Sequence, residues 1–97
     1  MDFSKMMEGL QKMQSQMTDM QSKITDTQAA GEAGGGMVRI VLDGKHHAVD
    51  VQISKEAMAD PEFLADLVKA AISQASDALA QKLETQVKQM MMQGGGG

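Results

Sequence analysis

Residues 37–53 read Met-Val-Arg-Ile-Val-Leu-Asp-Gly-Lys-His-His-Ala-Val-Asp-Val-Gln-Ile, and this stretch decides the fold. Its first half is rich in β-branched residues, which favour strands. The dipeptide Asp43-Gly44 in its middle is typical of tight hairpin turns. Because alternate residues of a strand share a face, the apolar residues of both halves fall on one face of a predicted β-hairpin. These residues are Val38, Ile40, Leu42, Val49, Val51 and Ile53.

The hairpin needs a further strand, because two strands alone are marginally stable in water. Residues 28–33 can supply it, and the sheet of a partner chain is the alternative. Glycine is dense in residues 29–36, at Gly31 and in the run Gly34–Gly36, and such a run ends a helix and lets the backbone turn sharply. A phosphate-binding loop is disfavoured, because no Lys-Ser/Thr follows the glycines and a strand comes next instead of a helix. We predict a sheet of three antiparallel strands over residues 29–53.

Before the sheet, residues 2–28 predict a helical arm. They contain no proline, one glycine, and many Met, Gln, Lys and Glu residues, which are good helix formers. The apolar residues recur at alternating steps of three and four, which is a strict heptad pattern. We call these residues the apolar stripe: Phe3, Met6, Leu10, Met13, Met17, Met20 and Ile24. At about 1.5 Å per residue the arm is roughly 40 Å long, too long for the rest of the chain to bury.

The apolar stripe is narrow, and a narrow stripe suits packing against another helix. Its flanking positions are almost uncharged, which suits self-association. We therefore predict that the stripe is the interface of a homodimer, the commonest form of soluble oligomer. Two other interpretations stay open: the stripe packs in part on the chain's own sheet, or its Met-rich face forms an adaptable groove for partner helices.

After the sheet, residues 54–93 predict a C-terminal helical region. Ser54 can cap a short turn over residues 55–58, and Asp60-Pro61-Glu62 is a typical helix start. Small residues on the long helix permit close packing on the sheet; they are Ala71, Ala75 and Ala78. Residues 94–97, all glycine, predict a flexible tail. The predicted fold is a single α+β domain over residues 1–97: helix, three-stranded antiparallel sheet and helix, in two layers.

Composition excludes several classes of protein. The chain has 97 residues, with 9 basic and 13 acidic ones and a net charge of −4, which suits one small domain. Without cysteine it forms no disulfide, iron–sulfur cluster or thiolate zinc site. No apolar stretch approaches the roughly 18 residues of a membrane span, and no signal peptide is recognisable, so we expect a soluble cytoplasmic protein with no membrane partner. Two aromatic residues leave little to line a pocket, so we expect no cofactor and no small-molecule substrate.

The sequence offers no catalytic or metal-binding constellation. His46 and His47 are the only histidines. Adjacent strand residues point to opposite faces, so the two do not bind one metal in a regular strand. The serines lie on helix faces or at a cap without a strained turn around them, and the carboxylates are scattered. We expect no metal site and no enzyme activity.

The series of a Met/Gln-rich helix, a glycine-rich break, a small hairpin and a helix that starts Asp-Pro-Glu is distinctive. The stretches that carry it are Met13-Gln14 through Met17, Met20-Gln21, Ile24, Gly31-Glu32, Gly34 to Val38, Asp43-Gly44, Val51-Gln52-Ile53 and residues 63–71. Together they resemble the YbaB/EbfC family of bacterial nucleoid-associated proteins, in order and length, over nearly the whole chain.

This resemblance implies an intertwined homodimer with protruding helical arms, located in the nucleoid. It also implies binding of double-stranded DNA at the ends of the first and last helices, with weak sequence preference and a role in nucleoid organisation or broad regulation. The basic residues at matching positions are Lys5, Lys12, Lys23, Lys82 and Lys88. Genes of this family often neighbour replication and recombination functions, which suggests a protein partner of that kind.

The charge balance of the arms departs from the family pattern, in which the arms often carry more lysine. Residues 1–30 have a net charge of −1 and residues 82–97 a net charge of +1. DNA binding depends mainly on phosphate neutralisation, so few contacts predict weak, salt-sensitive binding. Two hypotheses follow: a homodimeric DNA-binding protein, or an adaptor whose Met/Gln-rich arms bind a replication or recombination protein.

Overall fold

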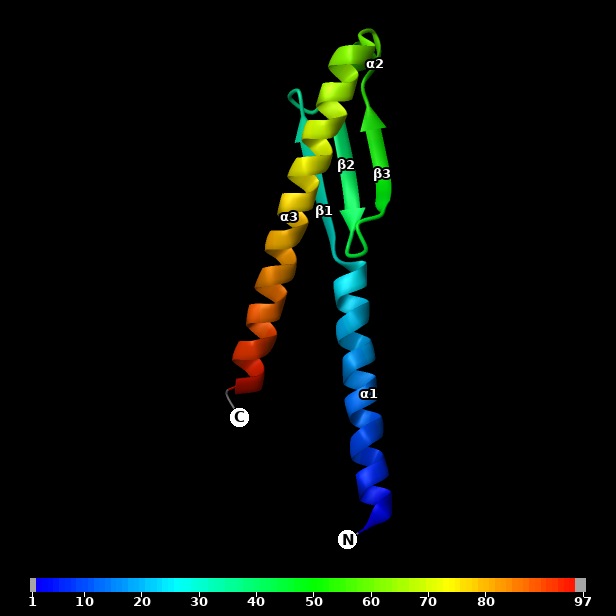
Figure 1. Cartoon of the computed structure of the whole chain (residues 1–97), viewed down its shortest axis with the longest axis vertical. Helices are drawn as coiled ribbons and strands as arrows, with labels where there is room; N and C mark the ends of the chain where they lie inside the picture. Colours follow the sequence, from blue (N-terminus) through cyan, green and yellow to red (C-terminus); the bar gives the residue numbers. More distant parts are fainter. Residues whose placement is uncertain (1, 96–97) are drawn as a thin grey trace.

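The computed structural model describes residues 2–95 of the chain. A long helix is followed by three strands, a short helix and a second long helix (Figure 1). The elements are α1 (Phe3–Asp26), β1 (Gln28–Ala33), β2 (Val38–Asp43), β3 (Ala48–Ile53), α2 (Lys55–Met58) and α3 (Pro61–Gly95). The predicted α+β class is confirmed: one long helix precedes the three-stranded antiparallel sheet in the sequence, and a second long helix follows it.

The sheet has the strand order β1-β2-β3, and both pairs are antiparallel. In the first pair Gly31 lies opposite Ile40, and in the second Val38 lies opposite Ile53. Three successive glycines turn the chain from β1 to β2. Gly34, Gly35 and Gly36 have φ values of 66°, 68° and 94°, a backbone conformation that glycine adopts without steric cost. The glycine run is therefore a turn between two strands.

The turn between β2 and β3 is wider than the tight turn predicted at Asp43-Gly44. Residues 44–47 separate the two strands, and the positive φ, 65°, belongs to His46. Gly44 serves a different purpose. A Cβ atom at this position would collide with the carbonyl oxygen of Ile24, and the Gly44 N–H donates to the oxygen of Thr25 at 3.1 Å. Glycine is needed here because the loop lies against the end of α1.

A β-bulge in β3 changes which side chains share a face. Val41 pairs with Asp50 and Leu42 pairs with Ala48, so Val49 is an extra residue between two regular pairs. It lines the sheet's outer face with Val41. The prediction that Val49 shares a face with Val51 and Ile53 is wrong, because one extra residue turns a side chain to the other side of the strand.

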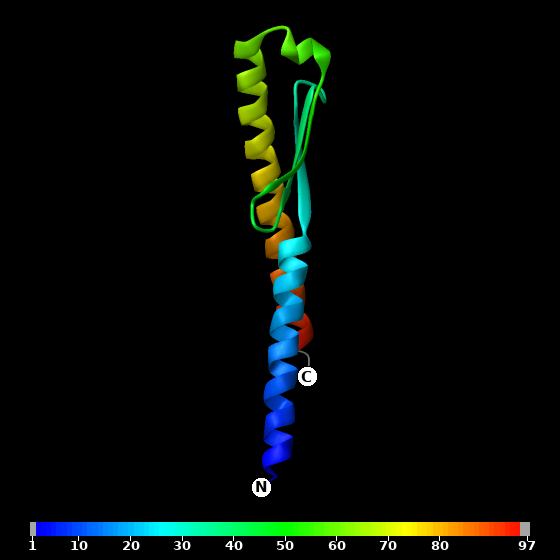
Figure 2. The same ribbon diagram turned by 90° about the vertical axis from the view of Figure 1, so that its right-hand side faces the viewer.

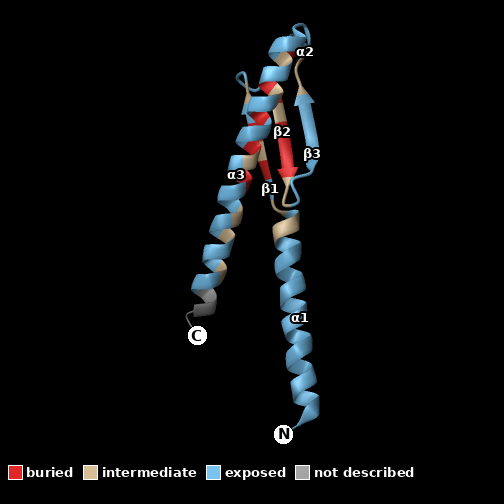
Figure 3. Ribbon diagram, in the orientation of Figure 1, coloured by how far each residue is buried: buried red, intermediate tan, exposed pale blue. Residues whose placement is uncertain are grey.

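Helix α3 packs on β1 and β2 to form the second layer, and Figure 2 shows the two layers edge-on. The helix approaches the sheet closely at Gly31, where a Cβ atom would collide with the backbone of Ala71 and Ala75. The buried core lies between these elements and is drawn red in Figure 3. It consists of Ala29, Val38, Ile40, Leu42, Ala57, Leu67, Ala71, Ala75 and Leu79. Small residues thus compensate for the few large ones by letting the layers come close.

Both predicted helix starts after the sheet are present. The Ser54 hydroxyl accepts from the N–H of Ala57 at 3.3 Å, and Asp60 Oδ1 accepts from the N–H groups of Glu62 and Phe63 at 3.1 and 3.2 Å. Helix α3 continues to Gly95, two residues past the predicted end, because glycine keeps the N–H that a helical bond needs. Residues 96–97 of the predicted tail lie outside the described residues. Within residues 2–95, no helix combines the length and apolar character needed to cross a bilayer.

Candidate nucleic-acid interface

The two long helices extend beyond the sheet toward the same end of the molecule and diverge (Figure 1). We call α1 together with residues 82–95 of α3 the fork, and the sheet, α2 and residues 61–81 the body. The molecule measures 71 × 23 × 14 Å, so the fork makes up much of its length. Helix α1 alone, with 24 residues, is about 36 Å long. A surface of this length can follow an extended partner.

The apolar stripe of α1 is uncovered. Within Phe3–Asp26, all of which the structure describes, no residue is buried, and Figure 3 shows this helix almost entirely in the colour of exposed residues. The side chains of Phe3, Leu10 and Met13 are 74%, 59% and 61% exposed, and only Ile24 of the stripe is half-buried. The alternative that the stripe packs on the chain's own sheet is therefore wrong: α1 points away from the sheet.

Three of the five predicted DNA-binding lysines lie on one line along α1. Lys5 and Lys23 are 18 residues apart, which is about five full helical turns, and Lys12 follows Lys5 after almost two turns. We call Lys5, Lys12 and Lys23 the lysine line. It lies about a third of a turn around the helix from the apolar stripe, so one helix presents the two surfaces in different directions. Beside the line, on the side away from the stripe, are the carboxylates of Glu8, Asp19 and Asp26.

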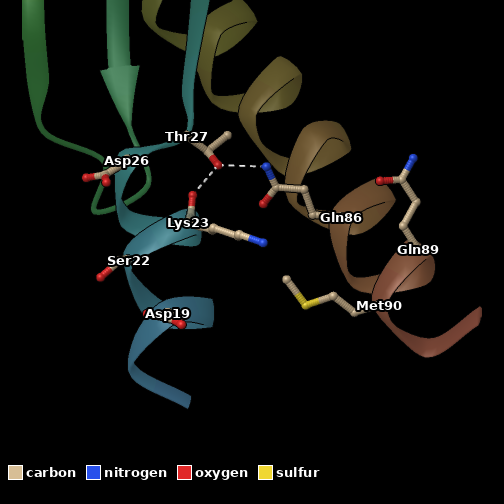
Figure 4. Close-up of a pocket in the computed structure, with 8 residues that line it drawn as sticks. All are labelled: Asp19, Ser22, Lys23, Asp26, Thr27, Gln86, Gln89 and Met90. Carbon is tan, nitrogen blue, oxygen red and sulfur yellow. Dashed lines mark hydrogen bonds between the residues drawn. The ribbon is translucent and has the colours of Figure 1, made fainter. Parts of the chain in front are cut away.

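At the base of the fork, the lysine line faces α3. A hollow between the helices is lined by Asp19, Ser22, Lys23, Asp26, Thr27, Gln86, Gln89 and Met90. Figure 4 shows the side chains of Lys23 and Thr27 directed toward α3, and the side chain of Gln86 directed toward Thr27. Since Lys5 and Lys12 share the direction of Lys23, the line runs along the inner side of the fork.

The two predicted lysines of α3 are placed differently from each other. Lys82 lies at the base of the fork, where its Nζ donates to the carbonyl oxygen of Gln28 at 2.7 Å. Lys88 pairs with Glu84 across one helical turn at 3.4 Å, and both side chains are mostly exposed. It lies nearly opposite Met90 around α3, outside the hollow. The structure thus brings Lys23 and Lys82 to the base of the fork but does not bring Lys88 there.

Charge is distributed unevenly between the ends of the molecule. The end formed by α2 and the start of α3 carries four carboxylates, those of Glu56, Asp60, Glu62 and Asp66. In Figure 1 this end lies far from the fork. With Lys55 included, residues 55–66 have a net charge of −3, whereas the fork has five lysines and four carboxylates. Most of the acidic excess therefore lies far from the fork, where it repels an anionic partner of the fork least. The low isoelectric point of about 4.9 describes the whole chain and does not reflect this difference in charge between its two ends.

The two histidines lie in the loop between β2 and β3. Asp43 organises this loop, because its Oδ1 accepts from the N–H groups of His47 and Lys45, both at 2.9 Å. The bond from His47, with a smaller contribution from Lys45, holds the pKa of Asp43 below its ordinary value of 3.8. Among residues 2–95, no three His, Cys, Asp or Glu side chains are grouped so that they could hold a metal ion.

The contacts that Gly44, Thr27 and Gln86 make at the base of the fork were not predicted from the sequence. Gly44 lies against the last turn of α1, and Gln86 Nε2 donates to Thr27 Oγ1 at 2.8 Å from a helix 59 residues away in sequence. Gln86 sits in a row of polar residues that looks like ordinary helix surface. Only Gly44 carries a signal, since a glycine in a turn can also mark a close approach.

Comparison with known proteins agrees with this architecture. Residues 1–95 match the sequence model of the YbaB/EbfC DNA-binding family. A nucleoid-associated protein of Hyphomonas neptunium is 42% identical over 88 residues, which cover 90% of this chain and 82% of that protein. A nucleoid-associated protein of Chlorobaculum parvum is 35% identical over 87 residues, covering 90% and 78% of the two chains.

A solved structure has the same fold. The crystal structure of the uncharacterized protein HP0035 from Helicobacter pylori superimposes with a TM-score of 0.69 and 26% identity, over 94% of this chain and 98% of that chain. The family is one of DNA-binding proteins and not of enzymes. The match over almost the entire chain shows that this chain belongs to the YbaB/EbfC DNA-binding family.

Proposed function

We propose that this protein is a homodimer that binds double-stranded DNA through the fork, with little sequence specificity and without catalysis, and so organises the nucleoid or modulates gene expression. The observation that carries the proposal is the lysine line on the inner side of the fork. Lys5, Lys12 and Lys23 project from a helix that has no buried residue between Phe3 and Asp26. Their ammonium groups are therefore free to meet phosphates along a length of about 27 Å.

Weak sequence specificity follows from the chemistry of these side chains. Lysine meets a phosphate as a point charge, and phosphate contacts carry no direct sequence information. Arginine, the commonest reader of guanine, occurs once, at position 39. Arg39 lies on the outer face of the sheet, 3.4 Å from Glu32 and 4.0 Å from Asp50, and not on the fork.

Homodimerisation is supported by the amount of apolar surface that one chain leaves uncovered. The apolar stripe of α1 is one such surface, and we propose all seven of its residues as part of the interface. A second is the inner side of β3: α3 lies over β1 and β2, so Val51 of β3 and Ile72 of α3 stay 51% and 45% exposed. A monomer seldom exposes apolar patches of this kind, whereas a second copy of the chain can cover both.

The DNA-binding proposal is tested by fluorescence-anisotropy titration of a labelled random-sequence duplex across a salt series. Lys5→Gln combined with Lys12→Gln removes two charges from the lysine line. Lys55→Gln combined with Lys69→Gln removes the same charge from exposed positions of the body. We expect the first variant to bind more weakly and its log–log salt slope to flatten by about 0.9 for each phosphate that it no longer neutralises. An equal decrease in affinity in both variants would contradict a role for the line.

The contribution of α3 is tested by a separate variant, Lys82→Gln combined with Lys88→Gln. If both lysines contact phosphate, this variant flattens the salt slope as the α1 variant does. Failure of the wild-type protein to bind DNA at low salt, while it remains a dimer, would reject direct DNA binding.

The dimer is tested by replacing Met13 and Met17 with lysine. Two charges in the centre of the stripe would remain unpaired on association, so we expect the dimer to dissociate in sedimentation equilibrium. The exposed pair Gln11→Lys and Ser15→Lys, elsewhere on α1, gives the same charge change outside the stripe and should leave the dimer intact. A dimer that survives the Met13 and Met17 replacements would reject the stripe as interface.

A second candidate function is supported by the charge balance of α1, whose three lysines are matched by three carboxylates. In this alternative the stripe binds a helix of a replication or recombination protein, and DNA binding is weak or absent. Capture of a defined partner by the wild-type chain, abolished by the Met13 and Met17 replacements and unaffected by those of Lys5 and Lys12, would favour it.

A further inference from the structure

The hydrogen bonds that attach α1 to the rest of the molecule are few, and they lie at the C-terminal end of the helix. The chain passes from α1 to β1 through Thr27, whose backbone is extended with φ −63° and ψ 133°. Along the rest of its length α1 diverges from α3, as Figure 1 shows. The direction of α1 is therefore set at its last turn.

Two contacts hold this last turn, one to the body and one to the other helix of the fork. On one side, the Gly44 N–H of the loop between β2 and β3 donates to the carbonyl oxygen of Thr25 at 3.1 Å. On the other side, Gln86 of α3 donates from Nε2 to Thr27 Oγ1 at 2.8 Å. Thr27 Oγ1 donates in turn to the carbonyl oxygen of Lys23 at 2.6 Å, as the dashed lines in Figure 4 show.

The hydroxyl of Thr27 is suited to this position. A hydroxyl has one proton to donate and lone pairs to accept with, so it can join the amide of Gln86 to a carbonyl of α1. The Lys23 oxygen also accepts from the backbone N–H of Thr27 at 3.1 Å, so the hydroxyl adds a second bond to the carbonyl at the end of α1. The hydroxyl oxygen of Thr27 therefore links the side chain of Gln86 in α3 to the carbonyl oxygen of Lys23 in α1.

We propose that Thr27 and Gln86 form a latch that fixes the angle of the fork and thereby positions Lys5 and Lys12 for contact with phosphates. The DNA part of this inference rests on the proposed function. A change of about 10° at the junction moves the far end of a 36 Å helix by about 6 Å. Phosphates of one strand follow each other every 3.4 Å or so along the axis, so a shift of this size takes a lysine past its phosphate.

The latch is tested by measuring the distance between the two helices. The chain has no cysteine, so Ser15→Cys on α1 and Ala80→Cys on α3, both exposed, give two unique sites for spin labels. The doubly labelled chain is diluted in a large excess of unlabelled chain, so that the signal comes from within one protomer. Pulsed electron–electron double resonance then gives the distribution of the distance between the two spin labels.

Two variants break the latch and two serve as matched controls. Thr27→Val removes the hydroxyl at nearly constant shape, and Gln86→Ala removes the donor. Thr27→Ser keeps the hydroxyl, and Gln89→Ala truncates a glutamine that lines the same hollow. We expect the distribution to broaden and shift in Thr27→Val and Gln86→Ala and to keep its wild-type form in the two controls. An unchanged distribution in the latch variants, or an equal change in Gln89→Ala, would overturn the latch.

DNA binding by the same variants tests the consequence. We expect the dissociation constant to rise about threefold to tenfold in Thr27→Val and Gln86→Ala with a flatter salt slope, and Thr27→Ser to restore both. Circular dichroism should show unchanged helix content. Altered distances with unaltered DNA affinity would overturn the positioning role. If the wild-type chain does not bind DNA, the proposed function and the positioning role fail together, while the distance measurement still decides whether the latch exists.

Discussion

The body and the fork of this molecule contrast in how their residues are used. In the body, ten apolar residues are buried, and glycine and alanine bring helix and sheet into backbone contact. In the fork, α1 buries no residue between Phe3 and Asp26, although it has the more regular apolar pattern. A regular apolar pattern thus shows that a helix has a surface to cover, and only the surrounding chain shows whether that surface is covered within the same molecule.

The largest effect should come from adding one methyl group to the body, and the same change in the fork serves as its control. Gly31→Ala places a Cβ atom against the backbone of Ala71 and Ala75, which cannot move aside, so we expect a loss of about 4 kcal/mol or more and failure to fold. Gly9→Ala meets nothing within 4 Å and should stabilise α1 by roughly 0.5–1 kcal/mol. Thermal unfolding followed by circular dichroism measures both, and similar effects in the two variants would contradict the contrast.

Truncating a leucine gives the next effect in size. Leu79 is fully buried, so Leu79→Ala should cost about 2–5 kcal/mol of unfolding free energy in urea denaturation. Leu10 is 59% exposed, and Leu10→Ala should change the stability of the body by no more than about 0.5 kcal/mol. If the apolar stripe is the dimer interface, Leu10→Ala instead weakens association in sedimentation equilibrium. A large loss of chain stability from Leu10→Ala, measured where the protein is monomeric, would show that α1 is buried in solution.

Removing carboxylates should sharpen the electrical contrast between the two regions. Asp19→Asn combined with Asp26→Asn removes repulsion between DNA and the inner side of the fork. We expect DNA affinity to rise about fivefold, which corresponds to about 1 kcal/mol for two exposed charges. Glu62→Gln combined with Asp66→Asn makes the same charge change at the far end of the body and should have a smaller effect. Equal gains from both variants, measured by anisotropy at one salt concentration, would show that net charge alone governs binding.

The smallest effect concerns the loop that joins the two regions. The pKa of Asp43 is lowered by the N–H groups of His47 and Lys45, so its ionised form favours the folded state. This stabilisation is present above the ordinary pKa of 3.8 and is lost as pH falls below it. Asp43→Asn should therefore lower the melting temperature slightly at neutral pH, and the difference from the wild-type chain should shrink at acidic pH. A difference that stays constant between neutral and acidic pH would show that ionisation has no part in it.

Much of the fold could be predicted because its signals are local. The glycine run before the hairpin, the cap at Ser54 and the start Asp60-Pro61-Glu62 each depend on residues within four positions of one another. The bulge at Val49 and the positive φ of His46 could not be predicted, because pairing between strands and packing against α1 determine them. The hydrogen bond from Gln86 to Thr27 joins residues 59 positions apart, and neither side chain distinguishes itself from its neighbours in the sequence.

The sequence by itself determined the elements and their surfaces: the heptad pattern of α1, the line formed by Lys5, Lys12 and Lys23, and the small residues that face the sheet. These follow from helical and strand periodicity, which is a property of the local backbone. Only the tertiary structure decided that the apolar stripe stays uncovered within one chain, that the lysine line faces the inner side of the fork, and that Lys82 lies at the base of the fork while Lys88 does not. Such relations depend on the direction in which one element leaves another, and here a few contacts at Thr27, Gly44 and Gln86 set that direction.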